Sequence, residues 1–456
     1  MASTSTAPPA GPTHPVIFTT KTQYVLPSQK FMVPLAWRRY HLSQLVNRAL
    51  SLPSPVPFDF LVQGEILRGT LQEWMVERGV GPEETLEVEY VESVLPPTKA
   101  AERKSEDWEA GVTCAVPGHF ATASYDGHIR VFDYAHFQTA KHTARIHPAP
   151  ITSLHVVPLQ STSSDEEQTY TILTSSHDLT ARLSTLSLSP NSPKPTTTKT
   201  LASLHLHTAP VSHVTVSQDG STVLTSSWDT LIGVWDTRIP PSDEVPDDAP
   251  DGERKKRRKL AKSGEEEKVV RKVPTAVLKS HTNRVSAAAF LPGSNEKAAS
   301  VGFDATVRTW DVENGLCTHT ITAPEKPFLA LAMHSTNNAF AASTDRNVSL
   351  FDLRSAASAP LLSLPHPATP SCLALPLAAA SHPGNPDNGG GGNENQLISG
   401  AYDGVVRLWD VRSTRVALAS MRMWEAGDKV LSVDWRGEVV AVAGEGGVGV
   451  WRVGRQ

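Results

Sequence analysis

The sequence predicts a mainly β protein in which one small unit is repeated many times, preceded by a single α+β domain. A phrase reading S-G-A-Y-D-G-V-V-R-L-W-D at 399–410 returns in imperfect copies downstream of residue 120. After the turn in each copy, apolar and polar residues alternate as they do in half-buried strands. The stretch before residue 92 contains no copy and includes segments of helical periodicity. With 456 residues, the chain has room for two or three domains.

Composition and charge exclude several classes of protein. The chain is 39% hydrophobic and 20% charged, which is typical of a soluble globular protein. Its net charge of -5 argues against a basic nucleic-acid-binding surface over the whole molecule, so any RNA contact would be local. The three cysteines, Cys114, Cys317 and Cys372, lack C-x-x-C spacing, which argues against a disulfide framework or a zinc site and favours a reducing compartment.

Neither a targeting peptide nor a membrane span is expected. Residues 1–14 lack a basic n-region and an apolar h-region, so we expect a disordered lead. The longest apolar run, at 373–380, is far shorter than the roughly 20 residues that cross a bilayer. We therefore expect a soluble intracellular protein without a membrane partner.

The first domain is expected at residues 15–92. Apolar spacing there predicts two helices among several strands, with Ser43 near the start of the first helix. The expected elements are strands at 16–24 and 30–35, a helix at 42–52, a strand at 58–67 that turns at Gly64, a helix at 71–78 and a strand at 85–91.

The run FDFLVQGEILRGTLQEWMVERGVGPEETLEVEYV at 58–91 resembles the second half of a ubiquitin-like β-grasp domain. The chain continues into E-S-V-L-P-P without a terminal Gly-Gly, so the resemblance implies docking rather than conjugation. Before the last strand, Pro82 stiffens a turn that presents Glu83. Glu83 is either a solvated loop carboxylate or a ligand offered to a partner's divalent cation.

The repeated phrase defines seven turns. Six of them carry an aspartate at the same place, and Glu445 stands in a degenerate seventh; the aspartates are Asp126, Asp178, Asp229, Asp304, Asp345 and Asp403. Six positions later the chain has, in order, Phe132, Ser184, Trp235, Trp310, Phe351, Trp409 and Trp451. Histidines precede three of the units, at His147, His207 and His281.

This pattern resembles the WD-repeat family, which implies a seven-bladed β-propeller of four-stranded blades at 107–456. Polar or low-complexity insertions at 161–169, 189–200, 239–273 and 381–395 account for the wide spacing of some copies. The seventh unit has only three strands after residue 429, so we expect residues 93–106 to form a linker and a strand that closes the ring.

The recurring polar residues are expected to be structural. In such blades, histidine, aspartate, tryptophan and a hydroxyl can form a buried hydrogen-bonded network. This expectation covers His207, His281, Trp235, Trp310, Trp409 and the six aspartates. The sequence contains no G-x-S-x-G, P-loop or H-E-x-x-H motif, so we expect no enzyme, cofactor or resident metal.

The residue before each aspartate is expected at the rim of the ring. Aromatic side chains dominate there, and such residues are typical anchors of protein interfaces. They either pack against neighbouring loops or form a binding face, and the candidates are Tyr125, His177, Trp228, Phe303 and Tyr402.

The insertion at 239–273 is expected to be disordered because it alternates acidic and basic blocks. Its basic run suits binding by a nuclear-import receptor first and contact with an RNA phosphate backbone second, or it only increases solubility. The run consists of Arg254, Lys255, Lys256, Arg257, Arg258 and Lys259.

The combination of domains, with PVPFDFLVQGEILRGTL at 55–71 and KVLSVDW at 429–435, resembles the WD-repeat member of the Pescadillo/Bop assembly. The resemblance implies a non-enzymatic biogenesis factor of the large ribosomal subunit in the nucleolus and nucleoplasm. Its propeller would bind a Bop-like WD-repeat protein and, through it, Pescadillo. The metal site of the ATPase midasin would take Glu83, or the adjacent Glu84, from its ubiquitin-like domain.

A second class of function stays open at this point. The chain could be a WD-repeat adaptor of a ubiquitin-ligase or chromatin complex, with its β-grasp domain contacting the degradation machinery. Co-sedimentation with large-subunit precursors would favour the first reading, and co-purification with a ligase core would favour the second.

Overall fold

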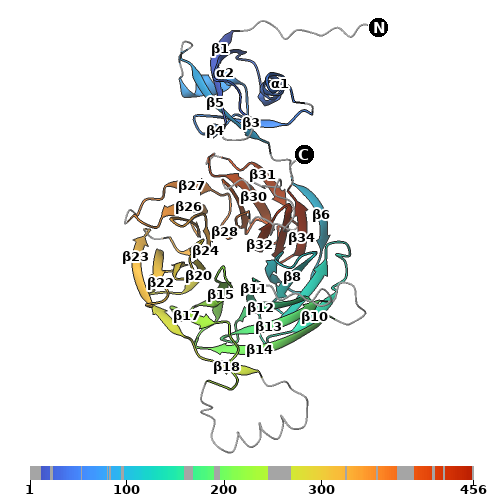
Figure 1. The fold of residues 1–456 in the computed structure, drawn as a ribbon, viewed down its shortest axis with the longest axis vertical. Coiled ribbons are helices and arrows are strands. Elements are labelled where there is room, and N and C mark those ends of the chain that lie inside the picture. The colour runs from blue at the N-terminus through green and yellow to red at the C-terminus, as the bar shows by residue number, and fades with distance from the viewer. Residues whose placement is uncertain are drawn as a thin grey trace, which may run out of the picture. The chain divides into compact units, whose positions relative to one another are not determined.

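A computed structural model describes residues 12–20, 24–52, 54–79, 81, 84–93, 97–158, 168–188, 196–244, 269–323, 326–355, 358–376, 395–412, 416–424 and 427–453. The chain divides into two compact units, one containing residues 1–97, 410–414 and 453–456, the other the remainder. The expected fold class is confirmed, because the first unit is an α+β domain and the second is a ring of seven β-sheets (Figure 1). No described helix is long and apolar enough to span a bilayer.

The first unit is one mixed sheet with two helices. Its elements are β1 (Thr13–Thr19), β2 (Lys30–Pro34), α1 (Arg39–Leu50), β3 (Phe58–Val62), β4 (Glu65–Ile66), α2 (Leu71–Arg78) and β5 (Leu86–Glu92). The strand order is β2-β1-β5-β3-β4, with β1 and β5 parallel and the other pairs antiparallel. A parallel pair at the centre of an otherwise antiparallel sheet is the arrangement of a β-grasp domain.

The two helices differ in how well the sequence marks their starts. Helix α2 covers the expected residues because Thr70 and Glu73 cap each other's backbone N–H groups, at 3.2 and 3.0 Å, and Gly79 ends it in the left-handed region. Helix α1 begins three residues before the expected start, after Arg38 rather than a usual capping residue. Ser43 lies inside that helix, where its hydroxyl accepts a hydrogen bond from the backbone of Phe58 at 3.1 Å.

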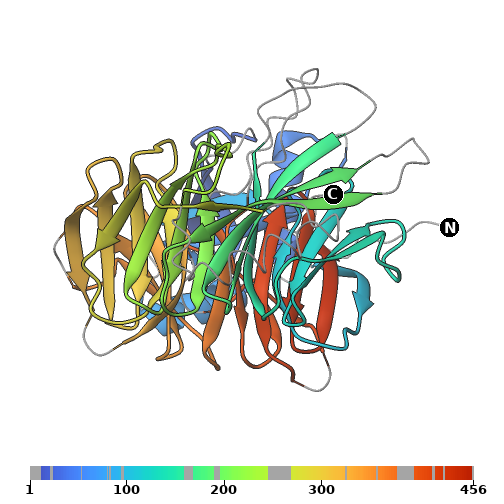
Figure 2. The same ribbon diagram turned by 90° about the horizontal axis from the view of Figure 1, so that it is seen from below.

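The propeller consists of seven radial sheets whose strands run through the disc that Figure 2 shows from its edge. Blade 1 contains β7 (Glu109–Thr113), β8 (His119–Ser124), β9 (His128–Asp133) and β10 (His142–Arg145). Blade 2 contains β11 (Ile151–Val157), β12 (Gln168–Ser176), β13 (Thr180–Leu188), β14 (Thr197–His205) and β18 (Val270–Lys272). Blade 3 contains β15 (Val211–Val216), β16 (Thr222–Ser227), β17 (Leu231–Asp236) and β19 (Ala276–Lys279).

The remaining blades complete the ring. Blade 4 contains β20 (Val285–Phe290), β21 (Lys297–Gly302), β22 (Thr306–Asp311) and β23 (Leu316–Thr322). Blade 5 contains β24 (Phe328–Met333), β25 (Asn338–Ser343), β26 (Asn347–Asp352) and β27 (Leu362–Pro365). Blade 6 contains β28 (Pro370–Ala374), β29 (Gln396–Ala401), β30 (Val405–Asp410) and β31 (Ala419–Arg422). Blade 7 contains β32 (Val430–Arg436), β33 (Val439–Gly444), β34 (Gly447–Arg452) and β6 (Thr98–Arg103).

The seventh blade joins distant parts of the chain. Strand β6 lies within the segment expected to close the ring, and it pairs antiparallel with β34, placing Ala101 opposite Val450 and Glu102 opposite Gly449. Four of the inner strands are also linked to the next blade, because a Ser or Thr hydroxyl near the start of each donates to a carbonyl of the following inner strand. These links are Thr152 to Val211 at 2.6 Å, Ser212 to Val285 at 2.6 Å, Ser286 to Phe328 at 2.5 Å and Ser371 to Val430 at 2.5 Å.

The ends of the charged insertion are ordered, which corrects the expectation that all of 239–273 is disordered. Strand β18 adds to blade 2 by pairing in parallel with β14. The approach to the insertion is bound to β18, because Glu244 donates its N–H to the Arg271 carbonyl at 2.9 Å and the Arg271 N–H donates to Asp243 at 3.0 Å. Expected insertions at 161–169 and 189–200 are likewise shortened by β12 and β14. Residues 254–259 lie outside the described residues.

Candidate functional site

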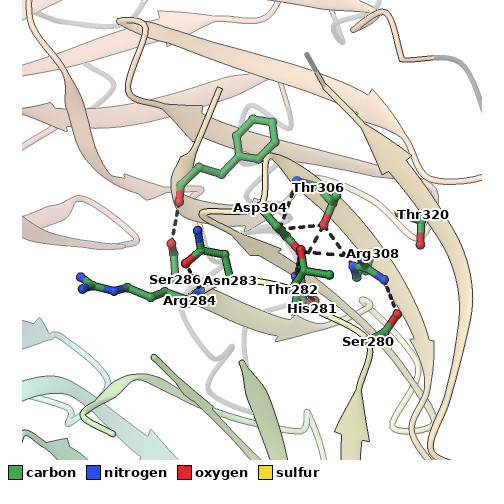
Figure 3. A network of polar contacts seen from close by, with 12 residues as sticks. Ser280, His281, Thr282, Asn283, Arg284, Ser286, Asp304, Thr306, Arg308 and Thr320 are labelled. Atoms are coloured by element: carbon green, nitrogen blue, oxygen red, sulfur yellow. Dashed lines mark hydrogen bonds and ion pairs between the residues drawn. The ribbon is translucent and has the colours of Figure 1, made fainter. Parts of the chain in front are cut away.

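The predicted polar network is most complete in blade 4. Asp304 accepts a hydrogen bond from His281 Nδ1 at 2.8 Å, and His281 Nε2 lies 2.6 Å from the hydroxyl of Ser300. The indole N–H of Trp310 donates to that hydroxyl at 2.8 Å. The aspartate also accepts from the hydroxyl of Thr306 at 2.8 Å (Figure 3). Each of these buried polar atoms therefore has a hydrogen-bond partner within the network, which is the condition for burying it without loss of stability.

Three other blades contain versions of this network. In blade 3, His207 contacts Asp229 at 3.0 Å and shares the Thr225 hydroxyl with Trp235. In blade 2, His147 contacts Asp178 at 2.8 Å. In blade 6, His366 and Trp409 share the Ser399 hydroxyl, at 2.7 and 2.9 Å, while Asp403 pairs with Arg407 instead of with the histidine.

His366 was absent from the sequence expectations, although it stands four residues before its inner strand, as His147, His207 and His281 do. The two remaining aspartates hold their own turns. Asp126 pairs with Arg130 and accepts the N–H of His128 at 2.9 Å, and Asp345 accepts from the Asn347 side chain at 3.0 Å. All six aspartates thus have partners within the described residues.

Charge in these networks is fixed by burial and hydrogen bonding. Burial opposes ionisation of Asp178 and Asp304, but the histidine bonds outweigh it and lower the pKa of each carboxyl to about 2. Burial lowers the pKa of His366 to about 4. These side chains are occupied with one another inside the blades, so an interaction site has to be sought elsewhere.

The rim residues share one backbone arrangement. In blades 1 to 6, the N–H of each donates to the carbonyl of the residue immediately before the inner strand of its own blade. The pairs are Tyr125 and Trp108 at 2.8 Å, His177 and Pro150 at 3.0 Å, Trp228 and Pro210 at 3.1 Å, Phe303 and Arg284 at 2.8 Å, Thr344 and Pro327 at 3.0 Å, and Tyr402 and Thr369 at 3.0 Å. All these turns therefore lie on one side of the disc, which we name the upper face.

Aromatic rings on the upper face form a continuous series, the aromatic arc. The ring centroids of Trp108 and Tyr125 are 5.4 Å apart, those of Tyr125 and His177 are 6.2 Å apart, and those of His177 and Trp228 are 5.6 Å apart. The guanidinium of Arg284 lies 4.5 Å from the Trp228 ring. The arc thus crosses from blade 1 to blade 4. Phe303 adjoins its end through the backbone hydrogen bond to Arg284.

The arc continues the other way into blades 7 and 6. The ammonium of Lys429 lies 5.6 Å from the ring centroid of Trp108 and 5.8 Å from that of Tyr402. Trp108 is 42% exposed, Tyr402 40% and Trp228 37%, so the arc presents large apolar surfaces to solvent. Exposed aromatic residues supported by fixed backbone are the usual centre of a protein interface.

The seventh turn differs from the others in length. Five residues, 124–128, separate the paired Ala123 and Ile129 in blade 1, whereas four, 444–447, separate the paired Ala443 and Val448 in blade 7. Gly444 precedes the degenerate Glu445 and is therefore the residue expected at the rim of this blade. Glu445 takes that position instead, because its N–H donates to the Lys429 carbonyl at 3.0 Å. Its carboxylate accepts from the Lys429 ammonium at 2.8 Å.

The inner strands surround a polar channel cavity of about 290 Å³. His155, His213 and Asp434 are among its lining residues. Burial, with the nearby His155, lowers the pKa of His213 to about 4. Among the described residues, no group of three histidines, cysteines or carboxylates is placed to hold a metal ion.

Two groups of predicted site residues lie outside the described residues. Glu83 is one, although the neighbouring Glu84 is an exposed residue whose N–H donates to the Gly81 carbonyl at 3.4 Å. The basic run from Arg254 to Lys259 is the other. The sequence missed Trp108 and Lys429, because both precede inner strands and stand outside the repeated phrase.

Comparison with known proteins agrees with both units. The model of the NLE (NUC135) domain matches residues 15–75, and that of the WD domain, G-beta repeat, matches 198–236, 272–311 and 391–410. The chain is 51% identical to ribosome biogenesis protein YTM1 of Laccaria bicolor over 100% of this chain and 99% of that protein. The protein of the same name from Coprinopsis cinerea is 52% identical over 96% of this chain and 94% of its own length.

The chain belongs to this family of ribosome biogenesis proteins. A more distant relative, ribosome biogenesis protein YTM1 of Saccharomyces cerevisiae, is 31% identical over 89% of each chain. Each segment that the WD model matches ends one residue after a tryptophan that bonds to a buried hydroxyl, namely Trp235, Trp310 or Trp409. Family membership therefore supports a role in ribosome assembly. The blades that the WD model does not match are the less regular ones, whose sequences depart from the repeat.

Proposed function

We propose that the protein is a non-enzymatic assembly factor of the large ribosomal subunit that acts in the nucleolus and nucleoplasm. The observation that supports this proposal most directly is its 51% identity, along the whole chain, to a ribosome biogenesis protein. Affinity purification from nuclear extract followed by sedimentation tests it. Co-migration with large-subunit precursors is the expected result, whereas co-purification with a ubiquitin-ligase core or a chromatin complex would contradict it.

The propeller is proposed to bind a Bop-like WD-repeat protein within the Pescadillo complex through its upper face. The aromatic arc supports this choice of face, because Trp108, Trp228 and Tyr402 are exposed and the backbones of the five proposed contacts are held by equivalent hydrogen bonds. The contacts proposed for the partner are Tyr125, His177, Trp228, Phe303 and Tyr402.

Replacing two exposed rings tests the interface. Trp228→Ala with Tyr402→Ala should weaken binding of the Bop-like protein by about 30-fold or more, since central aromatic anchors contribute about 2 kcal/mol or more. Leu316→Ala is the matched control, because Leu316 is 62% exposed but begins the outer strand of blade 4. Equal affinity of the double variant and the control would place the interface on another face.

The ubiquitin-like domain is proposed to offer Glu83 to the metal site of midasin, which would remove the factor from pre-ribosomes. The support is the family resemblance of the loop between α2 and β5, since carboxylate oxygen is a ligand that Mg²⁺ accepts readily. Glu83→Gln should abolish metal-dependent capture while leaving propeller binding intact. Glu84→Gln is the matched control, and loss of capture in that variant alone would move the assignment by one residue.

The basic run from Arg254 to Lys259 is proposed to direct nuclear import. Its six consecutive basic residues support this role. Deleting the run should leave the protein in the cytoplasm, and fusing an unrelated import signal should restore both location and function. A deletion variant that reaches the nucleus but fails to join pre-ribosomes would assign the run to rRNA instead.

A further inference from the structure

Lys429 occupies an aromatic site built from separate blades. Its ammonium lies between the rings of Trp108 and Tyr402, 5.6 and 5.8 Å from their centroids, and 2.8 Å from Glu445. The site is open, because the Lys429 side chain is 45% exposed and both rings face solvent. The chain therefore fills a cation site on its upper face with one of its own residues.

We propose that this aromatic site is a receptor for an arginine side chain of a partner protein, and that Lys429 is the internal cation which that arginine displaces. The proposal rests on the proposed function of the upper face as a protein-binding surface. It adds the chemistry of the incoming residue and a competing group within the chain.

The site is built to remain in place when the ammonium leaves. Two hydrogen bonds hold Glu445 to the backbone of Lys429. The Glu445 carboxylate accepts the Lys429 N–H at 3.1 Å, and the Glu445 N–H donates to the Lys429 carbonyl at 3.0 Å. Trp108 is fixed by the bond from Tyr125 to its carbonyl, and Tyr402 by its own N–H bond. A lysine side chain is long and flexible, so it can swing into solvent without moving the two rings or the carboxylate.

Arginine suits this site better than lysine. A guanidinium stacks face-on against aromatic rings and can pair with a carboxylate through two parallel hydrogen bonds. The same arc already contains such a contact, because Arg284 lies 4.5 Å from the Trp228 ring, closer than Lys429 approaches either of its rings. An arriving guanidinium could therefore stack on Trp108 while taking the Glu445 carboxylate from Lys429.

The local charge favours a protein over a nucleic acid. Glu445 lies at the site. Burial is the largest cause of the raised pKa of the Tyr125 phenol, and the nearby Tyr402, Glu445 and Asp107 raise it further. Phosphate groups would meet these carboxylates, and the one cation between the rings is already neutralised by Glu445. A cationic side chain would instead be attracted to these carboxylates and to the faces of the aromatic rings.

The test uses the full chain labelled with 5-fluorotryptophan, with the Trp108 resonance assigned from a Trp108→Phe variant. The probe is the peptide acetyl-Gly-Arg-Gly-amide, and the control probe replaces arginine by neutral citrulline. Arginine peptide should shift the Trp108 resonance saturably, and the citrulline peptide should not. Lys429→Met should tighten binding by about threefold or more because it removes the competitor, and Glu445→Gln should weaken it to a similar extent.

Lys429→Arg is the matched variant, because it keeps an internal cation and should give no gain in affinity. Equal shifts with both peptides, or unchanged or weaker binding to Lys429→Met, would overturn the proposal. A shift with oligouridylate but not with arginine peptide would instead identify a nucleic-acid surface. None of these readouts involves the Bop-like protein, so a partner that binds elsewhere leaves the result interpretable.

Discussion

The indole N–H of Trp310 donates a hydrogen bond of 2.8 Å to the hydroxyl of Ser300 within the interior of blade 4. The same hydroxyl lies 2.6 Å from His281 Nε2, so one small side chain joins two large ones. Because Ser300 and Trp310 are almost fully buried, water cannot replace either bond.

Removing that hydroxyl should be costly. Ser300→Ala leaves the Trp310 N–H and one nitrogen of His281 without a partner, and the free energy of unfolding should fall by about 2–4 kcal/mol. Urea denaturation followed by tryptophan fluorescence measures it. Thr318→Ala, at an exposed position of the outer strand β23, should change the value by less than about 0.5 kcal/mol. Similar losses in both variants would mean that the shared hydroxyl carries no special weight.

The short turn of blade 7 should not tolerate a side chain at Gly444. A Cβ there would lie 2.1 Å from the Lys429 carbonyl oxygen and 2.7 Å from the ring of Trp424. Gly444→Ala should therefore lower stability by about 1–3 kcal/mol and shift blade 7. Gly81→Ala is the control, because a Cβ at Gly81 meets no atom within 4 Å. An unchanged denaturation midpoint for Gly444→Ala would show that the turn relaxes.

Proline in the closing strand should open the ring. Ala101→Pro with Glu102→Pro affects two successive paired residues of β6, and because N–H groups alternate in direction along a strand, one proline must remove a bond to β34. Limited proteolysis should become faster at blade 7. Ala101→Ser with Glu102→Thr keeps both N–H groups and should digest like the natural chain, whereas equal digestion of both variants would contradict the role of the pairing.

Stability should depend on pH through buried histidines. The folded pKa of His213 and of His366 is lowered to about 4, below the ordinary value near 6.5, so the unfolded chain binds more protons between these limits. Each histidine's contribution is complete above pH 6.5 and is lost as pH falls towards 4, up to roughly 3 kcal/mol. The carboxyls of Asp178 and Asp304, with pKa near 2, stay ionised throughout this window.

The variant that tests this dependence is His213→Leu, because His213 lines the channel. Its stability should fall less steeply than that of the natural chain between pH 6.5 and 4, measured as urea midpoints at several pH values. If leucine packs less well than histidine, the variant should be less stable than the natural chain near neutral pH, and the difference in stability should be smallest at low pH. Parallel curves would show that His213 does not change protonation on folding.

The repeated phrase predicted the ring because its signals are local. A turn aspartate and a tryptophan six residues later fix a hairpin wherever they occur. Helix α2 was predicted from the apolar spacing of residues 71–78, and the structure adds the caps at Thr70, Glu73 and Gly79. The start of α1 was missed because Arg38 carries no capping signal. Strand β18 was missed because three residues in a charged segment pair only through tertiary contact with β14.

The upper face could be predicted only in part. Five aromatic or histidine positions followed from their place before the aspartates, but Trp108 and Lys429 come from loops that have no repeat. Glu445 rather than Gly444 lies at the rim because the turn of blade 7 is one residue shorter than that of blade 1. Aligning the repeats on Trp451 alone does not show this difference. Such features arise where a closed ring departs from its own symmetry, and there periodicity carries no information.

The pairing of β6 with β34 also determines when the ring can close during synthesis. Strand β6 leaves the ribosome before any of the propeller's other strands, and its partner β34 is the last of them to emerge. Until β34 has emerged, β6 has no partner strand and blade 1 has no complete blade 7 beside it. Strand edges that the closed ring covers are then exposed to other nascent chains. A factor that helps to assemble ribosomes is therefore itself incomplete until almost its whole propeller has been translated.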